Sequence, residues 1–178
     1  RSAQVDALTQ VSNRAHFVAS AQQVFRDHRQ TVSLVIFDLD FFKHINDSFG
    51  HATGDWVLRA VCVAIQSHLR KTDLFGRLGG EEFALCLTGF TPDEVLQVAE
   101  RCRVAILSID TQPSGYEFTI TSSFGIATRT ANDRTSYEDL LIAADKALYV
   151  SKNNGRNRVS VYRPPATNTS TEPATALH

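Results

Sequence analysis

The sequence is poor in cysteine and has no clear excess of charge of either sign. Its three cysteines, Cys62, Cys86 and Cys102, form no Cys-x-x-Cys pair and no zinc-binding spacing with histidine. An odd number of widely separated cysteines argues against a disulfide framework, so we expect buried thiols in a reducing compartment. The formal net charge of −1 provides no general attraction to nucleic acid or anionic membranes. We therefore expect no nucleic-acid partner, and local groups must hold any phosphate-bearing ligand.

Methionine and long apolar runs are missing altogether. No apolar run approaches the ~18 residues that a membrane-spanning helix needs, so we expect a cytoplasmic domain, alone or as part of a membrane-anchored protein. Because not even a starting methionine is present, we also expect a fragment of a longer protein. Its remainder would carry an upstream sensory domain or a membrane anchor.

Helix and strand patterns alternate along most of the chain. The apolar run Leu34–Phe37 is unbroken, which favours a strand covered on both faces. Two short apolar runs separated by Gly-Gly-Glu indicate a β-hairpin, and Thr91–Glu94 has the composition of a helix capping box. The expected strands are 31–38, 73–78, 82–87 and 118–127, and the expected helices are 54–70, the segment after 91–94, and the segment from Ser136 to Gly155.

The element order is helix, strand, helix, hairpin, helix, strand, helix and short strand. This order predicts an α/β sandwich of the α+β type, with a mostly antiparallel central sheet flanked by helices. We place the domain at residues 1–162. Residues 163–178 are rich in Pro, Thr, Ser and Asn, and they predict a disordered tail because they carry too little apolar surface to order themselves.

Gly79 and Gly80 occupy the tip of the expected hairpin and stand directly before Glu81 and Glu82. Glycine can adopt positive φ and lets another group approach the backbone closely. Glu81 would then project from a defined turn. An ordinary Gly-Gly turn with solvated glutamates explains the same pattern equally well.

A second acidic group, Asp38 and Asp40, ends the buried apolar strand, and Lys43 follows it. An acid at a strand end beside an acidic hairpin tip has the chemistry of a Mg²⁺ site, because magnesium takes a few hard oxygens and leaves room for substrate phosphates. Such a site requires the strand and the hairpin to be neighbours in the sheet, which the pattern alone leaves open. Solvated strand-end acids are the alternative.

The segment between these two acidic groups, residues 43–55, is polar. Asn46, His51 and Asp55 do not continue a core-facing pattern. From the residues alone we expect a surface loop with Asx turns and helix-capping side chains.

Four stretches taken together resemble the GGDEF domain, the catalytic module of bacterial diguanylate cyclases. They are residues 6–14, 37–55, 77–83 and 144–159, and they span nearly the whole chain outside the tail. The resemblance implies a fold similar to adenylyl cyclase and the polymerase palm, and condensation of two GTP molecules into cyclic di-GMP with release of pyrophosphate. It also implies a two-fold homodimer, because each domain holds one GTP and presents it to the other.

The same resemblance gives roles to individual residues. Asp38, the carbonyl of Leu39 and Glu81, helped by Glu82, would hold two Mg²⁺ ions, with Mn²⁺ as the alternative metal. Glu81 would also accept the proton of the attacking 3′-hydroxyl, whereas Asp40 is not assigned as a ligand. The implied substrate contacts are Phe41, Phe42, Lys43, Lys152 and Arg156 with the phosphates, Gly79 and Gly80 with the nucleotide, Asn46 and Asp55 with guanine, and His51 with a neighbouring part of the substrate.

An Arg-x-x-Asp stretch from Arg70 to Asp73 precedes the glycine pair and resembles the inhibitory site of the family. With Arg101 as a secondary contact, it would bind the product cyclic di-GMP and inhibit the enzyme. A basic pair that ends a helix, followed by an acid that starts a strand, is the structural alternative.

The N-terminal motif departs from the family at Gln10 and Ser12, where glycine and proline are frequent, and no catalytic residue is affected.

Other interpretations stay open. A catalytically silent GGDEF domain that acts as a receptor for GTP or cyclic di-GMP would have the same fold, although such members usually lack the acidic pair or the guanine contacts kept here. An unrelated nucleotidyl transferase with a palm-like core is a further alternative. Lys152 and Arg156 also fit a structural role as favourable cations near a helix C-terminus.

Overall fold

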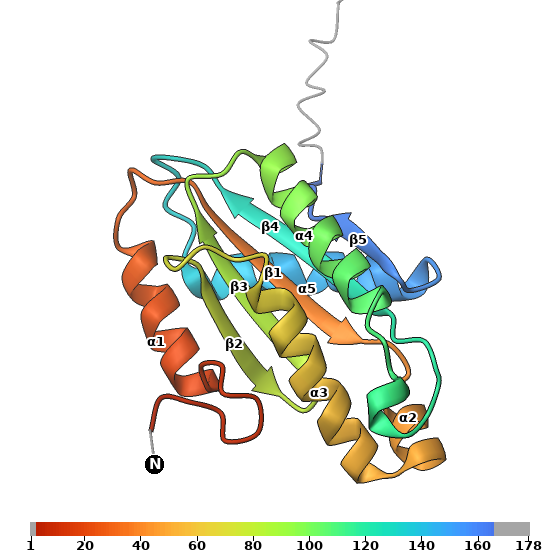
Figure 1. Ribbon diagram of the computed structural model, residues 1–178. Helices are drawn as coiled ribbons and strands as arrows, with labels where there is room; N and C mark the ends of the chain where they lie inside the picture. Colours follow the sequence, from red (N-terminus) through yellow and green to blue (C-terminus); the bar gives the residue numbers. More distant parts are fainter. Residues whose placement is uncertain (1–2, 166–178) are drawn as a thin grey trace, which may run out of the picture.

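The computed structural model describes residues 3–165, which fold into a five-stranded sheet with helices on both faces (Figure 1). The strands are β1 (Val32–Leu39), β2 (Leu74–Gly79), β3 (Glu82–Thr88), β4 (Ser122–Arg129) and β5 (Arg158–Val161). The helices are α1 (Arg14–Phe25), α2 (Phe42–Phe49), α3 (His51–Gln66), α4 (Pro92–Leu107) and α5 (Tyr137–Asn153), with a short 3-10 helix η1 (Gln112–Ser114).

The strand order in the sheet is β2-β3-β1-β4-β5. β4 and β5 pair in parallel, and the other neighbouring strands are antiparallel. The prediction of an α+β sandwich with a mostly antiparallel sheet is thereby confirmed.

β1 is the middle strand and is covered on both faces. Val35 and Phe37 belong to the apolar cluster shared with α3 and α4, whereas Leu34 and Ile36 belong to the cluster shared with α1 and α5. Figure 1 shows α3 and α4 in front of the sheet and α5 behind it. Burial on both sides explains why this strand has an unbroken apolar run instead of an alternating pattern.

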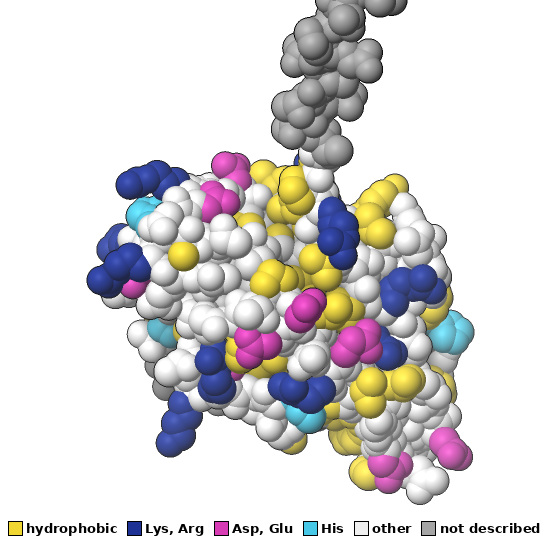
Figure 2. Space-filling model, turned by 90° about the horizontal axis from the view of Figure 1, so that it is seen from above, with side chains coloured by type: hydrophobic (Ala, Val, Ile, Leu, Met, Phe, Trp, Pro, Cys, Tyr) yellow, Lys and Arg dark blue, Asp and Glu magenta, His cyan; other side chains and the backbone are white. Residues whose placement is uncertain are grey.

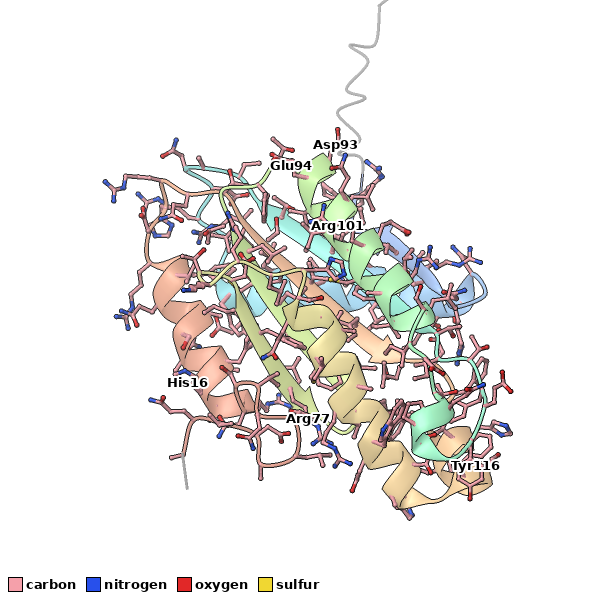
Figure 3. All side chains as sticks on the ribbon, viewed as in Figure 1. His16, Arg77, Asp93, Glu94, Arg101 and Tyr116 are labelled. Carbon is pink, nitrogen blue, oxygen red and sulfur yellow. The ribbon has the colours of Figure 1, made fainter. Side chains whose placement is uncertain are left out.

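The predicted helix caps are present. The Thr91 hydroxyl accepts the Glu94 N–H and the Glu94 carboxylate accepts the Thr91 N–H, which forms a capping box where α4 begins (Figure 3). The Ser136 hydroxyl accepts the Asp139 N–H at the start of α5, and Gly155 follows its end with a φ of 114°. The two N-terminal caps provide acceptors for amides that the first turn of a helix leaves without partners.

Residues 43–55 do not form the surface loop that their polar composition predicted. They belong to α2 and to the beginning of α3, and the two helices are separated at Gly50, where φ is 92°. Phe42, Ile45 and Phe49 form an apolar face at i, i+3 and i+7, with Ile45 buried and the two phenylalanines partly buried against the core, and the sequence analysis missed this pattern. α3 begins at His51, earlier than predicted, and ends at Gln66.

β4 begins at Ser122, later than the strand predicted at 118–127. The Phe118 N–H donates to the Thr111 hydroxyl oxygen, and the same hydroxyl donates to the Phe118 carbonyl. These bonds to a side chain replace pairing with a strand. Ile120 is nevertheless buried in the core, which explains the apolar alternation of this segment.

The N-terminal segment covers the outer edge of β2. The Ser12 N–H donates to the Phe75 carbonyl, and the Arg77 N–H donates to the Ser12 carbonyl, so that Ser12 forms a parallel bridge with Gly76. The middle of β2 is therefore hydrogen-bonded on both sides.

Cys62, Cys86 and Cys102 are buried and form no disulfide, as predicted, and burial raises the pKa of each thiol to about 12. Within residues 3–165 no helix has the length and apolarity required to cross a bilayer. The predicted disordered tail, 163–178, lies outside the described residues except for 163–165, and it stays a prediction.

Candidate active site

The end of β1 lies beside the tip of the β2–β3 hairpin. Asp38 is opposite Glu82 in the antiparallel register, and the Leu39 N–H donates to the Glu81 carbonyl over 3.3 Å. Asp38 is also close enough to both glutamates to interact with them electrostatically. The structure thus brings together the two acidic groups whose proximity the sequence pattern left open.

The hairpin tip has a defined shape. Gly80 has a φ of 51°, a left-handed conformation that glycine adopts without steric cost. Arg77 Nε donates to the Gly80 carbonyl over 2.8 Å, and Arg77 Nη1 lies 3.2 Å from Asp6 Oδ2. Figure 3 shows Arg77 at the lower end of the sheet, beside the N-terminal segment. Glu81 therefore projects from a turn that two other segments brace.

Charged groups surround the Asp38 carboxylate. Lys152 Nζ, in the last turn of α5, lies 2.6 Å from Asp38 Oδ2. Burial raises the pKa of Asp38, the neighbouring Lys152 ammonium lowers it, and Glu81 and Asp40 raise it further. Lys152 is therefore the cation that balances Asp38 in this arrangement.

Glu82 is in a similar environment. Burial raises the pKa of its carboxyl group, and the negative charges of Asp145 and Asp38 raise it further, while Lys152 and Arg14 oppose the rise. Two partly buried carboxylates at neighbouring positions make the binding of an additional cation favourable.

The oxygens at this edge suit magnesium. The carboxylates of Asp38 and Glu81 and the carbonyl of Leu39 are hard donors of the kind that Mg²⁺ prefers. In the part of the chain that the structure describes, no three acidic, histidine or cysteine side chains already converge on one point. Mg²⁺ is commonly held by one or two carboxylates and completes its shell with water and substrate phosphates, so the residues present fit the ion together with a nucleotide.

The N-terminus of α2 forms a second part of the site. Phe41 precedes this helix in a left-handed conformation, with φ of 55° and ψ of 33°, and its side chain caps no amide. The first amides of a helix have no intrahelical acceptor and can bind an anion. Lys43 is exposed in this first turn, and the Arg156 guanidinium lies 5.0 Å from the centre of the Phe41 ring. Groups that attract phosphate therefore lie next to the acidic groups.

Asp40 has a different role from Asp38. It is 6% exposed, and its carboxylate accepts hydrogen bonds from the Thr121 hydroxyl, the Ser123 hydroxyl and the Asn157 N–H. These bonds join the end of β1 to the start of β4 and to the turn that carries Arg156. Sequence analysis missed the three partners of Asp40, because nothing in their spacing along the chain indicates the contact.

Asn46 and Asp55 lie on neighbouring helices, α2 and α3. Gly54, directly before Asp55, lies against the Asn46 side chain so closely that a Cβ added at Gly54 would collide with the carboxamide. The helices could not approach in this way with a larger residue there. Gly54 is thus a positioning residue that sequence analysis missed, although a glycine inside a helix is a signal of close approach. His51 is exposed at the first position of α3.

Arg70 and Asp73 are in direct contact. The Arg70 N–H, Nε and Nη2 all donate to the Asp73 carboxylate, with distances of 2.6, 3.1 and 2.8 Å, and the guanidinium lies 4.1 Å from the centre of the Phe90 ring. Both residues line a cavity of about 440 Å³ beside the N-terminal segment. Arg101 lies on α4 (Figure 3) and lines a separate hollow with His68, so it does not share the cavity of Arg70 and Asp73.

Comparison with known proteins indicates one family for nearly all of the described residues. Residues 3–158 match the family model described as "Diguanylate cyclase, GGDEF domain". Diguanylate cyclase A of Treponema denticola is 40% identical over 135 residues, which cover 76% of this chain and 36% of that protein. The chain spans about a third of the length of the curated relatives that it matches.

Solved structures with similar folds agree with the sequence relatives. The GGDEF domain of DgcB from Caulobacter crescentus, solved in complex with c-di-GMP, has a TM-score of 0.85 and 33% identity, and the match covers 91% of this chain and 97% of that one. The active GGEEF domain of a diguanylate cyclase from Vibrio cholerae has a TM-score of 0.79 and 32% identity, over 87% of this chain and 99% of that one.

Proposed function

The chain belongs to the GGDEF domain family, and on that basis we propose that it is the catalytic domain of a diguanylate cyclase. It would condense two molecules of GTP into cyclic di-GMP and release two pyrophosphates. The observation that carries the proposal is the position of Asp38 beside Glu81 and Glu82, next to the free N-terminus of α2. Carboxylates that hold metal thus adjoin groups that hold phosphate.

Metal would bind through Asp38, the Leu39 carbonyl and Glu81, with Glu82 as an additional ligand. When bound, Mg²⁺ neutralises charge on the triphosphate and aligns the attacking and leaving oxygens. Lys152 Nζ, which contacts Asp38 Oδ2 at 2.6 Å, would have to leave this carboxylate as metal enters. The same ammonium would then be available to the phosphates.

The phosphates would be held by the chain itself. The first amides of α2 supply hydrogen-bond donors on one side of the acidic groups. Positive charge on the same side comes from the side chains of Lys43, Lys152 and Arg156. Glu81 would accept the proton of the 3′-hydroxyl, because it directly follows the braced hairpin tip and interacts electrostatically with Asp38.

Asn46 and Asp55 would read the guanine base, with His51 as a neighbouring contact. A carboxylate accepts hydrogen bonds from guanine N1–H and N2–H₂, whereas adenine presents a lone pair at N1. A site built for such bonds can reject an analogue by about 10⁴-fold. We therefore infer that GTP is the substrate and ATP is not.

Since one domain would hold one GTP, turnover requires two copies facing each other about a two-fold axis. The Arg70–Asp73 pair would bind cyclic di-GMP and inhibit the enzyme, and this binding would have to open the present contact between the two side chains.

The three buried free thiols support a reducing compartment such as the cytoplasm, where GTP is available.

The test is incubation of the chain at high concentration with GTP and Mg²⁺, followed by chromatography for cyclic di-GMP and measurement of pyrophosphate. The proposal requires product formation that is lost in Glu81→Ala. The control is Asp93→Ala, which Figure 3 shows at the opposite end of the molecule from Arg77 and the hairpin tip. Binding of GTP without turnover by the unaltered chain would favour the alternative function, a catalytically silent receptor.

A further inference from the structure

A second cluster of positive charge lies at the end of the sheet far from Asp38. There the end of α1, the end of β4 and the start of α5 border a cavity of about 290 Å³ that is wide open to solvent. Its wall contains Arg26, His28, Arg129 and Arg134 but only one acidic residue, Glu138. Figure 2 looks onto this end of the molecule and shows Lys and Arg side chains gathered at its left edge. We refer to this cavity as the arginine pocket.

The arginine pocket is separate from the candidate active site. Arg129 pairs with Val32 at the start of β1, whereas Asp38 lies near the end of the same strand. The two sites are therefore at opposite ends of the central strand, and no residue lines both.

Arg129 is a buried cation without a carboxylate partner among the described residues. It is 1% exposed, its Nη1 donates to the carbonyls of Phe25 and Thr135, and its Nη2 donates to the carbonyl of Asp27. Its guanidinium also lies 4.6 Å from the centre of the Phe25 ring. These contacts cap the end of α1, but they bring no full negative charge, and burial of an unbalanced charge is unfavourable.

Unused polar atoms concentrate on the same wall. Within residues 3–165, buried side-chain atoms without a hydrogen-bond partner occur in four residues, and three of them, His28, Arg129 and Tyr137, line the arginine pocket. The atoms are His28 Nδ1, Arg129 Nε and the Tyr137 hydroxyl. Arg129 Nε–H is a donor, so it needs an acceptor that the described part of the chain does not supply. The groups that act electrostatically on the Tyr137 hydroxyl are Cys86, Arg14, Glu138 and Asp145 rather than the arginines of the pocket.

The start of α5 adds to the positive potential of the pocket. Ser136 and Tyr137 line it, and this helix runs for 17 residues. Ser136 caps the amide of Asp139, which leaves the earlier amides of the first turn available to an anion.

The acidic groups nearby are already engaged. Glu138 accepts a hydrogen bond from Gln22 Nε2 over 2.7 Å, and the Asp27 carboxylate binds Arg29. Asp133 is exposed and accepts hydrogen bonds from the Thr135 N–H and hydroxyl. Asp133 interacts electrostatically with Arg129, but none of these carboxylates forms an ion pair with the arginines of the pocket among the described residues.

We propose that the arginine pocket binds a small anion with phosphate chemistry, either a free phosphate or pyrophosphate ion or the phosphate group of a nucleotide. The exposed Arg26 and Arg134 would form its outer contacts, while Arg129 and the first amides of α5 would form the inner ones. The cavity is no larger than the lower end of ordinary ligand pockets, about 300 Å³, which favours a small anion over an extended ligand.

The first test is isothermal titration of the chain with orthophosphate, pyrophosphate and GMP in separate arms, at matched ionic strength and without Mg²⁺. The variant Arg26→Gln/Arg134→Gln changes two exposed side chains, so the fold should persist. We expect it to weaken phosphate binding at least about tenfold, which corresponds to the loss of charge-assisted hydrogen bonds. Binding of orthophosphate or pyrophosphate without GMP identifies a free ion as the ligand, and comparable binding of GMP identifies a phosphate group on a nucleotide.

The control variant is Arg59→Gln/Lys146→Gln, which removes the same number of positive charges at exposed positions of α3 and α5 outside both sites. It should leave binding at the arginine pocket unchanged. Lys43→Gln/Arg156→Gln separates out any anion that binds at the candidate active site. If the unaltered chain does not bind any of the three anions, or if Arg26→Gln/Arg134→Gln weakens binding no more than the control variant does, the proposal is wrong.

A second test observes Arg129 directly. The Nε–H resonance of Arg129, identified by its absence in Arg129→Lys, should shift downfield when phosphate is added, because its donor gains an acceptor. The same resonance should stay in place in Arg26→Gln/Arg134→Gln at the same phosphate concentration. An unaltered chain in which phosphate leaves this resonance unchanged would contradict the proposed site.

Discussion

Lys152 and Asp38 form an ion pair across the candidate active site, with 2.6 Å between Nζ and Oδ2. The lysine comes from the last turn of α5 and the aspartate from β1, so the pair joins two elements that are far apart in the sequence. The same carboxylate is a proposed metal ligand. Under the proposed function, metal and Lys152 would compete for Asp38, and the contacts within the site would change when metal and nucleotide bind.

Replacement of Lys152 tests this exchange. Lys152→Gln removes a cation that is proposed to pass from Asp38 to the phosphates, so we expect the KM for GTP to rise about tenfold, the effect of losing one charge-assisted hydrogen bond. Pyrophosphate release at varied GTP and Mg²⁺ measures it. The matched control is Lys146→Gln, an exposed lysine of the same helix, which should have the kinetics of the unaltered chain. Equal effects of the two substitutions would show that Lys152 has no specific role.

Glu82 gives a prediction about pH. Its pKa is raised in the folded state, mainly by burial, so the ionised form is less favourable in the fold than in the unfolded chain. This cost is absent below the unfolded pKa near 4.5, develops as pH rises through the folded pKa, and is complete above it. We therefore expect Glu82→Gln to raise the Tm at pH 8 by roughly 1–3 °C and to change it little at pH 4. Thermal unfolding in buffer with a chelator measures both values, and a gain confined to pH 4 would reverse the predicted sign.

Asp40 is predicted to contribute stability rather than metal binding. The Thr121 hydroxyl and the Asn157 N–H donate to Asp40 Oδ2, and the Ser123 hydroxyl donates to Oδ1. Asp40→Asn replaces one of these oxygens by an NH₂ group that cannot accept, so the bonds to that oxygen are lost and the charge is removed. We expect a loss of about 1–3 kcal/mol in the free energy of unfolding, measured with urea. Asp47→Asn, at an exposed position of α2, is the control and should change stability by less than about 0.5 kcal/mol. If Asp40→Asn unfolds like the control, these hydrogen bonds are not important for the fold.

The contact between Gly54 and Asn46 can be measured by a double-mutant cycle. In a helix, Gly→Ala normally adds up to about 1 kcal/mol of stability, but at Gly54 the new methyl group would collide with the Asn46 carboxamide. We expect Gly54→Ala to destabilise the fold by about 1–3 kcal/mol. In the Asn46→Ala background the same substitution should cost at least about 1 kcal/mol less. Additive effects would mean that the two side chains do not constrain each other.

Arg70 is predicted to act in inhibition and not in turnover. Arg70→Ala should keep the initial rate within about twofold but raise the cyclic di-GMP concentration needed for inhibition at least about tenfold, since a bidentate guanidinium contact would be lost. Progress curves with added product measure both. Arg59→Ala, an exposed arginine on α3, is the charge-matched control. Unchanged inhibition of the Arg70 variant would reject the inhibitory site.

The sequence predicted those features of the fold that depend on local chemistry. The unbroken run Leu34–Phe37 indicated a strand covered on both faces, and Thr91 and Glu94 indicated the beginning of a helix. The helix α2 escaped prediction although Phe42, Ile45 and Phe49 have helical spacing, because so short a helix repeats its apolar face only twice and its other residues are polar. Propensity and periodicity describe neighbours along the chain, and α2 is fixed mainly by its packing on α3.

The candidate site was only partly accessible from sequence for the same reason. The residue pattern supplied Asp38 and Glu81 as candidates and the resemblance to a family gave them roles, whereas the sheet register, which places Asp38 opposite Glu82, shows that they are neighbours. By contrast, the buried Arg129 and the hydrogen bonds of Asp40 depend on contacts between segments that are remote in the sequence. The spacing of residues along the chain does not predict such contacts.

The bridge between Ser12 and Gly76 has a consequence for assembly. An uncovered outer strand offers unpaired N–H and carbonyl groups on which a second chain can add a strand. On the β2 side those groups are occupied at the middle of the strand by the chain's own N-terminal segment. For two copies to join into one continuous sheet through this edge, the N-terminal segment would first have to leave Gly76, which opposes edge-to-edge aggregation there.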